Sequence, residues 1–512
     1  MEKGKRMATI SERLASSLTI LKDLQEVEKI AVKSSELSRT HRERLVRSGF
    51  LKEVMRGWYI PTRPDEPVGE STSWYTSFWY FCAAYLEERF GKEWSLSPEQ
   101  SVIIHAGNLT VPRQLLVRAP GARNQTTQLP FDTSIFETRA KMADAEEEVV
   151  DAHGLRLFSL ESALIYSPEV FFRNNPVDVR AALATFRDGT ELLRKLLDGG
   201  HSVVAGRLAG AFRNIGRDAI AADILAGMRS VGYTVTEQDP FAAPSTLLLP
   251  SRQVLPQVNR LHLMWLSMRE TVLEEFPEEP GIPADREGYL QRVADLFVND
   301  AYNSLSIEGY WVSADLIERI KAENWQPEAR DSDRQHRDAM AARGYWLAFQ
   351  SVKKELQAVL EGAEPGKVAE SAHRTWYREL FAPSVEAGII RASDLAGYRN
   401  QPVYIRQSKH VPPGSELVRD LMPAYFELLS TEKSAAVRAV LGHFVFVYIH
   451  PYVDGNGRIA RFLMNLLMAS GGYPWMIVPM SRREEYMAAL ESASADQQIR
   501  PFARFLASIL ES

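Results

Sequence analysis

The residues from 450 to 461 place, within one short stretch, side chains that could handle a phosphate group. The stretch reads His-Pro-Tyr-Val-Asp-Gly-Asn-Gly-Arg-Ile-Ala-Arg. His450 is a candidate general base, because a neutral imidazole can take a proton from an incoming hydroxyl. Gly455-Asn456-Gly457 allow backbone angles in which consecutive N–H groups point at one anion, and a following helix would aim its positive end there.

Three charged side chains complete this set. Asp454 offers carboxylate oxygens, which suit Mg²⁺, an ion that prefers a few protein oxygens together with phosphate oxygens of a nucleotide. Arg458 and Arg461 are three residues apart, so on a helix they share a face and could hold the outer phosphates of a triphosphate. The combination predicts transfer of a phosphoryl group from a nucleotide to an alcohol.

Two buried helices should position this loop. Apolar residues recur at helical spacing on both sides of it, which predicts that one helix ends at His450 and that another follows Gly457. The apolar positions are Val437, Val440, Leu441, Phe444, Val445 and Tyr448 before the loop, and Ile459, Phe462, Leu463 and Leu466 after it.

Each part of the loop alone has a simpler explanation. A His-Pro pair commonly ends a helix, Asp-Gly and Asn-Gly commonly form turns, and two Arg on one helix face are commonly solvated. At this spacing, however, the stretch resembles the signature of the Fic family, His-Pro-Phe-x-Asp/Glu-Gly-Asn-Gly-Arg-x-x-Arg. Tyr452 departs from it by replacing Phe, and its hydroxyl should be tolerated where it reaches water or a hydrogen-bond partner.

The resemblance implies a role for each residue of the loop. The usual Fic reaction transfers AMP from ATP to a Ser, Thr or Tyr hydroxyl of a protein substrate and releases pyrophosphate. By resemblance, His450 would be the general base and Asp454 would hold Mg²⁺. The residues that would bind the nucleotide phosphates are Gly455, Asn456, Gly457, Arg458 and Arg461. The sequence offers no feature that we can connect with recognition of adenine.

Residues near 397–414 resemble the flap of Fic proteins, which aligns the backbone of the target beside the site. The resemblance rests on Gly397-Tyr398-Arg399, on Val403, Tyr404 and Ile405, and on His410-Val411-Pro412-Pro413. Considered without the family, the middle segment is a short alternating strand bounded by Gly and Pro, as in a hairpin. We therefore expect an extended hairpin here.

Residues near 293–309 resemble the Fic inhibitory helix with its Ser/Thr-x-x-x-Glu-Gly/Asn motif. The motif residues are Ser304, Glu308 and Gly309, and Ser304 and Glu308 share a helix face. The simpler explanation is a solvated helix end with Gly as its C-cap. The resemblance implies that Glu308 pairs with Arg461 and occupies the place of the γ-phosphate, so the protein would be nearly inactive as encoded.

Length and composition limit the class of protein. A chain of 512 residues is long enough for two or three domains, and its 45% apolar and 25% charged residues are typical of a soluble globular protein. A single cysteine, Cys82, excludes an intrachain disulfide and fits a reducing cytoplasm. The first residues are polar, so no secretion signal is evident, and the aromatic run 74–85 is too short to span a bilayer. We expect a cytoplasmic protein with no membrane partner.

The front of the chain is basic although the whole carries a net charge of -6. Residues 33–63 hold eight Lys and Arg against three Glu, a net charge of +5. Ser38 can cap a helix that runs to Gly49, and residues 50–54 and 57–61 read as two short strands. Helix, helix and basic hairpin predict a winged helix-turn-helix, which resembles the N-terminal domain of AbiEi-type antitoxins. Candidate DNA contacts are Arg39, Arg42, Arg44 and Arg56, and use of this fold for protein contact or dimerisation is the alternative.

The fold expected for the whole chain is multidomain. A winged helix-turn-helix at 1–66 precedes an AbiEi-like α/β module at 67–236, a Pro-containing linker at 237–256, and a mainly α-helical Fic domain at 257–512. Within the α/β module, strands are expected at 101–104, 114–118 and 155–158, and helices at 159–165, 177–185 and 217–231.

The leading functional hypothesis is a protein adenylyltransferase that uses ATP and Mg²⁺ and is inhibited by Glu308. One alternative is a DNA-binding transcription regulator, or a toxin–antitoxin-like switch, that uses the Fic domain as a sensor. Another is a Fic enzyme that transfers a different phosphoryl group or removes AMP. The sequence leaves open the target protein, the base preference, the signal that relieves inhibition, and whether the chain forms a homo-oligomer.

Overall fold

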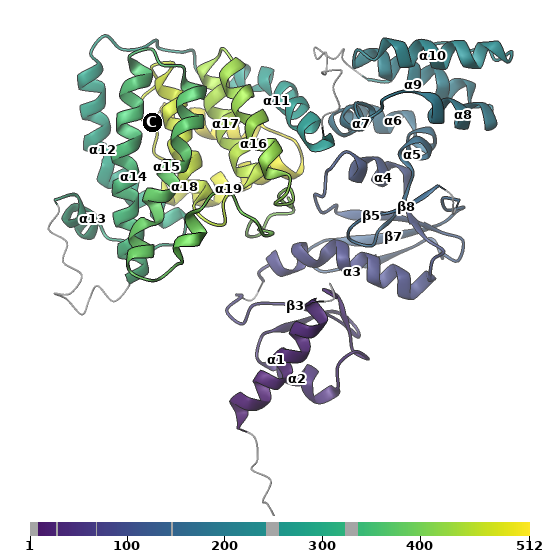
Figure 1. Ribbon diagram of the computed structural model, residues 1–512, viewed down its shortest axis with the longest axis horizontal. Coiled ribbons are helices and arrows are strands. Elements are labelled where there is room, and N and C mark those ends of the chain that lie inside the picture. The colour runs from purple at the N-terminus through teal and green to yellow at the C-terminus, as the bar shows by residue number, and fades with distance from the viewer. Residues whose placement is uncertain are drawn as a thin grey trace, which may run out of the picture. The chain divides into compact units, whose positions relative to one another are not determined.

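The computed structural model describes residues 9–26, 29–67, 69–144, 147–241, 255–322 and 336–511 (Figure 1). The chain divides into two compact units. The first comprises Met1–Pro256 together with Tyr404–Val411, and the second comprises Gln257–Val403 and Pro412–Ser512. Most of the expected linker, residues 242–254, lies outside the described residues.

The first unit begins with two helices and a small sheet. Ser38 caps the second helix, because its side chain accepts a hydrogen bond from the His41 N–H at 3.3 Å. The three strands are antiparallel in the order β1-β3-β2, and they share a small apolar core with α1 and α2. These elements are α1 (Ile10–Glu26), β1 (Val32–Lys33), α2 (Arg39–Arg47), β2 (Leu51–Met55) and β3 (Trp58–Pro61). The expected helix and hairpin are therefore present.

The rest of the first unit combines helices with two further sheets. Helix α3 (Thr72–Phe90) contains the aromatic run, and its buried rings pack against the four-stranded sheet of order β4-β5-β7-β6, in which only the β5–β7 pair is parallel. A separate antiparallel pair joins β8 to β9. The strands are β4 (Ser95–Leu96), β5 (Gln114–Ala119), β6 (Gln125–Gln128), β7 (Ser134–Arg139), β8 (Glu148–Val150) and β9 (Arg156–Phe158).

Seven helices accompany these sheets among the described residues of the first unit, after α3. They are α4 (Pro98–His105), α5 (Leu160–Tyr166), α6 (Glu169–Asn174), α7 (Pro176–Leu183), α8 (Thr190–Asp198), α9 (Ser202–Asn214) and, last in the chain order, α10 (Asp218–Ser230). The strands expected at 114–118 and 155–158 and the helices expected at 159–165, 177–185 and 217–231 are present to within a few residues.

The strand expected at Ser101–Ile104 is wrong, because these residues lie in helix α4. Ser97 accepts a hydrogen bond from the Gln100 N–H at 3.2 Å, and Pro98 takes the first helical position. Proline suits that position because its missing N–H would have no partner there. The Ser-Pro pair thus starts a helix whose apolar residues are too few to distinguish it from a buried strand.

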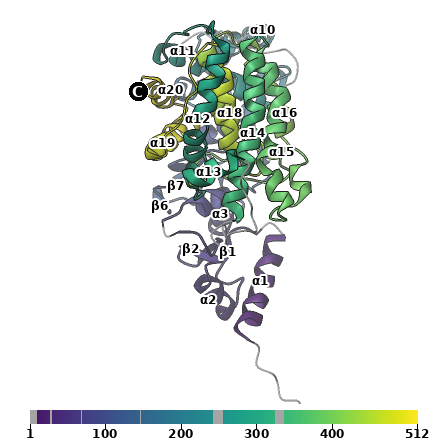
Figure 2. The same ribbon diagram turned by 90° about the vertical axis from the view of Figure 1, so that its left-hand side faces the viewer.

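The second unit is helical. Helices α12, α14, α15 and α18 run side by side in both ribbon views (Figures 1 and 2), and neighbouring helices are in contact. Its described helices are α11 (Pro256–Glu275), α12 (Arg286–Ile307), α13 (Ala314–Lys321), α14 (His336–Leu360), α15 (Pro365–Glu386), α16 (Val418–Thr431), α17 (Ala435–Ile449), α18 (Asn456–Ala469), α19 (Arg483–Ala495) and α20 (Arg500–Leu510). No described helix of either unit is long and apolar enough to cross a membrane.

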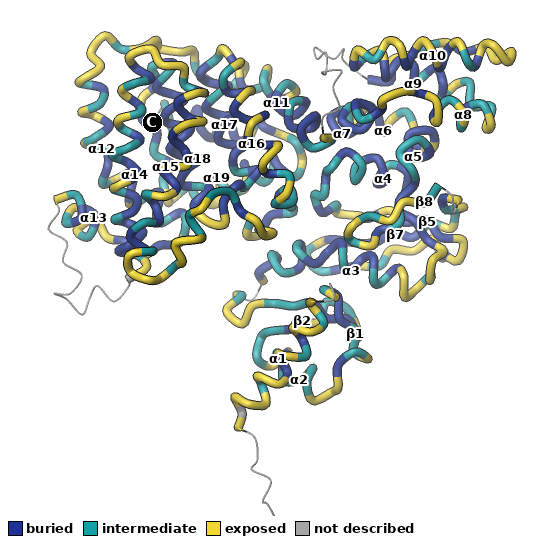
Figure 3. The backbone as a smooth tube through the Cα atoms, in the orientation of Figure 1, coloured by how far each residue is buried: buried dark blue, intermediate teal, exposed yellow. Residues whose placement is uncertain are grey.

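The pair α17–α18 forms the centre of the helical unit. Almost every residue of both helices is buried, and the tube is dark blue along them (Figure 3). The pair is buried all round rather than on one stripe, as expected for helices covered by neighbours on every side, and α18 also buries two arginines and two asparagines. The loop that joins them, residues 450–455, is therefore attached at both ends to a rigid core.

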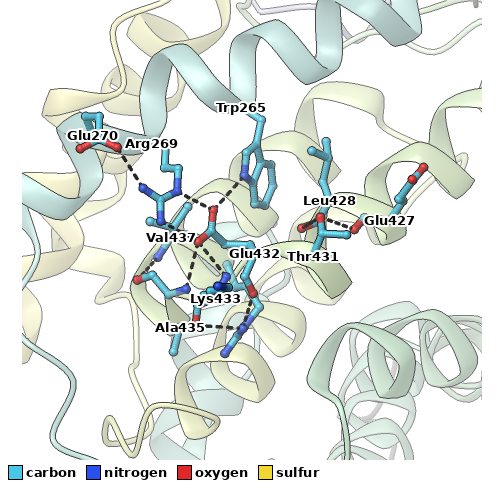
Figure 4. Close-up of polar contacts among 12 residues, drawn as sticks. Trp265, Arg269, Glu270, Glu427, Leu428, Thr431, Glu432, Lys433, Ala435 and Val437 are labelled. Carbon is cyan, nitrogen blue, oxygen red and sulfur yellow. Dashed lines mark hydrogen bonds and ion pairs between the residues drawn. The ribbon is translucent and has the colours of Figure 1, made fainter. Parts of the chain in front are cut away.

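Glu432 connects three elements at the start of α17 (Figure 4). Its carboxylate, 5% exposed, accepts two hydrogen bonds from Arg269 of α11, at 2.9 and 3.1 Å. It also accepts bonds from the backbone N–H groups of Lys433 and Ser434, at 2.9 and 3.0 Å. One carboxylate thus fixes α11 and the turn from α16 into α17.

Candidate active site

The loop between α17 and α18 is shaped by left-handed backbone at both ends. His450 caps α17 with φ 52°, and Gly455 precedes α18 with φ 81°. The side chain of Asn456, which is buried, spans the loop: its Oδ1 accepts from the Tyr452 N–H at 2.9 Å and its Nδ2 donates to the Tyr452 carbonyl at 2.8 Å. The Asn456 side chain thus holds the loop closed, and only its backbone N–H is left to face an anion.

The His450 ring is oriented by its own helix. Its Nδ1 lies 3.2 Å from the carbonyl of Val447, and because a carbonyl can only accept, Nδ1 must carry the hydrogen. Nε2 therefore keeps its lone pair. Burial lowers the pKa of His450 to about 4, so the ring is neutral near pH 7. An imidazole in this state can accept a proton through Nε2.

The first turn of α18 has the geometry of an anion site. The first N–H groups of a helix have no partner within it, and they carry the positive end of the helix dipole. A Cβ on Gly455 would lie 2.8 Å from Phe381 Cε2, and a Cβ on Gly457 would overlap Glu308 Oε1. Close contacts therefore favour glycine at both positions, and the backbone angle favours it at Gly455 as well.

Asp454 lies at the solvent edge of this turn, with 54% of its side chain exposed. Its Oδ1 accepts from the Gly455 N–H at 2.6 Å, while Oδ2 lies 3.5 Å from both Tyr310 Oη and Arg458 Nη2. Among the described residues, no group of three or more His, Cys, Asp or Glu could hold a metal ion. Asp454 can thus supply one metal ligand, which suits a magnesium ion whose other ligands are phosphate and water.

Arg461 is held by both residues that the inhibitory motif singles out. Its Nε donates to Ser304 Oγ at 2.9 Å, and its Nη2 donates to Ser304 O at 3.0 Å and to Glu308 Oε1 at 2.7 Å. Arg461 is almost fully buried and Glu308 is 23% exposed. A charge-assisted pair at this distance occupies the guanidinium that a phosphate would otherwise use.

Glu308 reaches Arg461 because α12 ends there. Gly309, with φ 84°, leaves the helix in the left-handed conformation, and its N–H donates to the Ser306 carbonyl at 3.0 Å. Gly309 is a C-cap, as the simpler explanation of the motif expects, but the carboxylate before it is bound to a buried arginine rather than solvated.

Arg399 ties the catalytic loop to both ends of the flap. Its Nε donates to the His450 carbonyl at 2.8 Å, its Nη1 to Gln401 O at 3.2 Å, and its Nη2 to Pro413 O. Its own N–H donates to Pro451 O at 2.9 Å. Sequence reasoning placed Arg399 in the flap motif but gave it no role. The sequence signal for Arg399 was a single arginine between a tyrosine and polar residues. That pattern fits a solvated arginine as well as a buried arginine that binds several backbone carbonyls.

A cavity of about 940 Å³ opens on the α15 and α16 side of Asp454. Its walls include the aromatic rings of Tyr377, Phe381 and Phe426 and the buried guanidinium of Arg399. The cavity gives a segment of another molecule space to approach the loop from this side.

Tyr452 packs as an aromatic residue at this position should. Its ring stacks on Tyr377 with centroids 3.9 Å apart and planes at 11°. Its hydroxyl is buried and, within the described residues, has no hydrogen-bond partner. The condition under which the extra hydroxyl was expected to be tolerated is therefore not met.

The middle of the expected flap is not a strand. Val403, Tyr404 and Ile405 have no regular secondary structure, and none of the described sheets includes them. Instead of a strand ladder, the segment shows hydrogen bonds from Arg399 to the carbonyls of Gln401 and Pro413, near its two ends.

The four candidate DNA contacts differ in their exposure and in whether they bond to other residues of the chain. Arg42 donates to Ser34 O at 2.9 Å, and Arg44 donates to Arg13 O and Ser17 Oγ, both at 2.8 Å, so these two hold the small domain together. Arg39 is 83% exposed but pairs with Glu43 at 2.7 Å. Arg56 is exposed at the turn between β2 and β3.

Comparison with known proteins relates the site to one family. The sequence model of the Fic/DOC family matches residues 368–468, which include the whole loop from His450 to Arg461. The chain is 41% identical over 118 residues to a protein adenylyltransferase Fic of Drosophila virilis and 40% identical over 118 residues to one of Drosophila willistoni. These alignments cover 22% of this chain and 24% and 23% of the relatives. The chain thus spans about a quarter of the length of the curated relatives it matches.

Solved structures give weaker similarities. A Fic domain containing signaling protein from Bacteroides thetaiotaomicron is 18% identical, with 49% of this chain and 92% of that chain covered and a TM-score of 0.34. Fic-1 from C. elegans is 17% identical, with 66% of this chain and 96% of that chain covered and a TM-score of 0.36.

Proposed function

Because residues 368–468 form a Fic/DOC family domain, we propose that this chain is a protein adenylyltransferase that transfers AMP from ATP to a hydroxyl side chain of another protein. The proposal rests on one observation above others. A neutral imidazole with a free Nε2, the N-terminus of α18 and the guanidinium of Arg461 belong to one short loop–helix segment. That segment lies within residues 368–468, which match the Fic/DOC family model, and similar proteins are named protein adenylyltransferase Fic.

The chemistry assigns one task to each group. His450 Nε2 takes the proton of the target hydroxyl as its oxygen forms a bond to the α-phosphorus. The bond from the α-phosphorus to the bridging oxygen breaks, and pyrophosphate leaves with that electron pair. The N–H groups at the start of α18 stabilise the charge on the phosphate oxygens, and Arg458 and Arg461 hold the distal phosphates. Asp454 would hold Mg²⁺, which neutralises phosphate charge when bound.

We propose further that Glu308 keeps the enzyme inactive. Its carboxylate occupies Nη2 of Arg461, and Ser304 occupies the Nε of the same guanidinium. A γ-phosphate would have to displace the carboxylate from a site that is partly shielded from water, where the ion pair is stronger than at the surface. ATP could then bind only in a position that is unproductive for transfer.

Intact-mass analysis of the full chain tests both proposals. The Glu308→Gly variant, incubated with ATP, Mg²⁺ and host lysate, should add one AMP to itself or to a target, while the wild-type chain adds far less. Glu308→Gly combined with His450→Ala should add none. A matched control is Glu361→Gly, because Glu361 also ends a helix of this unit before a glycine, but it is exposed and bonded to Gln357.

The outcomes separate the alternatives. Equal, low activity of wild type and Glu308→Gly would reject the inhibitory role of Glu308. A mass gain from UTP or of a phosphate alone would replace AMP transfer by another phosphoryl transfer. Loss of AMP from a modified protein would indicate removal rather than addition.

A second proposal concerns residues 1–66, which resemble the winged helix of AbiEi-type antitoxins: this region contacts DNA through its exposed basic residues. Exposed Arg39 and Arg56, within a stretch of net charge +5, support it. In gel shifts with the promoter region of its own gene, binding should weaken as salt rises and should weaken further in Arg56→Ala. Arg194→Ala, an exposed arginine of α8, is the control. A chain that fails to bind at low salt but forms dimers would assign this region to protein contact.

A further inference from the structure

Arg458 is a buried cation without hydrogen bonds. Its side chain is fully buried, and among the described residues none of its three guanidinium nitrogens has a hydrogen-bond partner. Asp454 Oδ2 lies 3.5 Å from Arg458 Nη2, which is too long for a good hydrogen bond. Asp454 therefore compensates only a fraction of the guanidinium charge. Burying a cation without hydrogen bonds is costly, so something else must hold Arg458 in this position.

Two aromatic rings hold it. The guanidinium carbon lies 5.1 Å from the centre of the Tyr310 ring and 4.9 Å from the centre of the Phe381 ring. Both distances are within the range of cation–π attraction, which is strongest where water is excluded. Ring faces attract the cation without accepting its N–H groups, so those groups stay available for phosphate oxygens.

Tyr310 is itself fixed in place. It is 7% exposed, and its N–H donates to the Leu305 carbonyl at 3.0 Å, which attaches it to the end of α12. Arg337 at the start of α14 also lies 5.1 Å from the ring centre, and Trp311 N–H donates to Asp338 Oδ2 at 3.3 Å. The hydroxyl of Tyr310 contacts Asp454 Oδ2 at 3.5 Å.

From this arrangement we propose that Tyr310 is a positioning residue that holds Arg458 ready for the distal phosphates of the nucleotide. The inference rests on the proposed function. It assigns a role to the residue directly after Glu308-Gly309, outside the inhibitory motif and outside the catalytic loop. Tyr310 acts through its ring, and the effect reaches the nucleotide only through Arg458.

The test is nucleotide affinity of the full chain, measured by calorimetry in the Glu308→Gly background. Tyr310→Ala should weaken ATP binding about tenfold, the size expected of a shielded cation–π contact. It should leave AMP binding nearly unchanged, because AMP has no distal phosphate. Tyr310→Phe keeps the ring and should bind ATP like the parent. Tyr302→Ala, which removes a half-exposed tyrosine from helix α12, is the control.

A double-mutant cycle decides whether Tyr310 acts through Arg458. In an Arg458→Met background, Tyr310→Ala should cause no further loss of ATP affinity. Equal weakening of ATP and AMP, an additive loss in the cycle, or parent-like ATP affinity of Tyr310→Ala would each overturn the inference. A parent that binds no ATP would overturn the proposed function, and this inference with it. Melting curves of each variant show whether a loss of ATP affinity is caused by unfolding. If Tyr310→Ala is unfolded, the comparison of Tyr310→Phe with the parent decides the inference.

Discussion

At the scale of single residues, the catalytic loop depends on residues that use most of their polar atoms in internal hydrogen bonds and keep one polar atom without such a bond. His450 uses Nδ1 for the Val447 carbonyl and keeps Nε2 for a proton. Asn456 uses its whole side chain on the backbone of Tyr452 and contributes only its N–H to the anion site. The chemistry of the loop is therefore carried by fewer groups than the residue types alone would suggest.

The lowered pKa of His450 gives a pH prediction. Burial brings this pKa to about 4, so the ring becomes protonated, and unable to act as a base, only near that pH. Values of kcat/KM for Glu308→Gly should therefore stay flat on the acid side from pH 8 to about 5. A histidine of ordinary pKa would lose about tenfold at pH 5.5. A loss of that size at pH 5.5, with circular dichroism unchanged, would contradict the assigned state of His450.

The unpartnered hydroxyl of Tyr452 predicts a stabilising substitution. A buried polar group without a partner costs about 1–3 kcal/mol, whereas the Phe ring would keep the stacking on Tyr377. Tyr452→Phe should raise the free energy of unfolding by about 1 kcal/mol, measured by calorimetry. Tyr345→Phe is the control, because that hydroxyl donates to Asp300 at 2.7 Å and its removal should destabilise. Equal losses in both variants would be evidence against this explanation.

At the scale of elements, helix ends determine what the site can do. The start of α18 would provide the proposed anion site, the end of α17 places His450, and the end of α12 brings Glu308 to Arg461. Because three ends converge, a change in the position of α12 alone would free Arg461 without disturbing the base. The inhibitory carboxylate and the proposed base thus lie at the ends of different helices, α12 and α17.

Glu432 is the element-level anchor of α17, and its removal should be costly. Burial of the carboxylate is the largest single influence and raises its pKa, but the hydrogen bonds and charge of Arg269, together with hydrogen bonds from the Ser434 N–H and Trp265, outweigh it and lower the pKa, so Glu432 is ionised near neutral pH. Glu432→Ala leaves Arg269 without its main partner and exposes two backbone N–H groups. Because Arg269 is 29% exposed, we expect a loss of about 2 kcal/mol, below the range for fully buried pairs.

The same calorimetric melt can include a matched control for Glu432. Glu427→Ala changes an exposed carboxylate on α16, the helix that ends directly before Glu432, and should shift the free energy of unfolding by less than about 0.5 kcal/mol. If both variants melt alike, the carboxylate of Glu432 does not anchor α11 to α17.

At the scale of the whole molecule, the two units differ in the structural elements that hold each of them together. The first unit combines small sheets with helices, whereas the second surrounds one buried helix pair. The second unit also buries two neutral histidines outside the catalytic loop, His373 and His443, and burial lowers their pKa values to about 4 and about 3.

From the lowered pKa values of these two histidines we expect the helical unit to be less stable in acid. Their pKa values are lower in the folded than in the unfolded chain, so the unfolded chain binds more protons below pH 6.5, and stability falls as pH drops from there toward 4. Each pKa unit of difference is worth about 1.4 kcal/mol. Asp300 opposes this effect, since burial raises its pKa to about 6. The melting temperature should fall between pH 6.5 and 4.5, and less steeply in His443→Gln. An unchanged slope in that variant would remove His443 from the explanation.

Much of the fold followed from local patterns in the sequence. Helical spacing of apolar residues predicted α17 and α18, and capping residues such as Ser38 predicted α2, because each signal acts within a few residues along the chain. Ser101–Ile104 was expected as a strand because a short apolar run fits either element, and the Ser-Pro start that decides it was overlooked. The flap was expected as a hairpin because local alternation says nothing about the arginine that holds its ends.

The sequence by itself determined which chemical groups the catalytic loop contains and that two buried helices join at it, since residue type and helical period are local properties. The tertiary structure decided which of those groups are already bound to other residues of the chain and which are not. That Ser304 and Glu308 occupy Arg461, that Tyr310 and Phe381 enclose Arg458, and that Arg399 holds the His450 carbonyl all depend on contacts between distant parts of the chain. Such contacts depend on how helices pack, and packing leaves no periodic signal at the residues that meet.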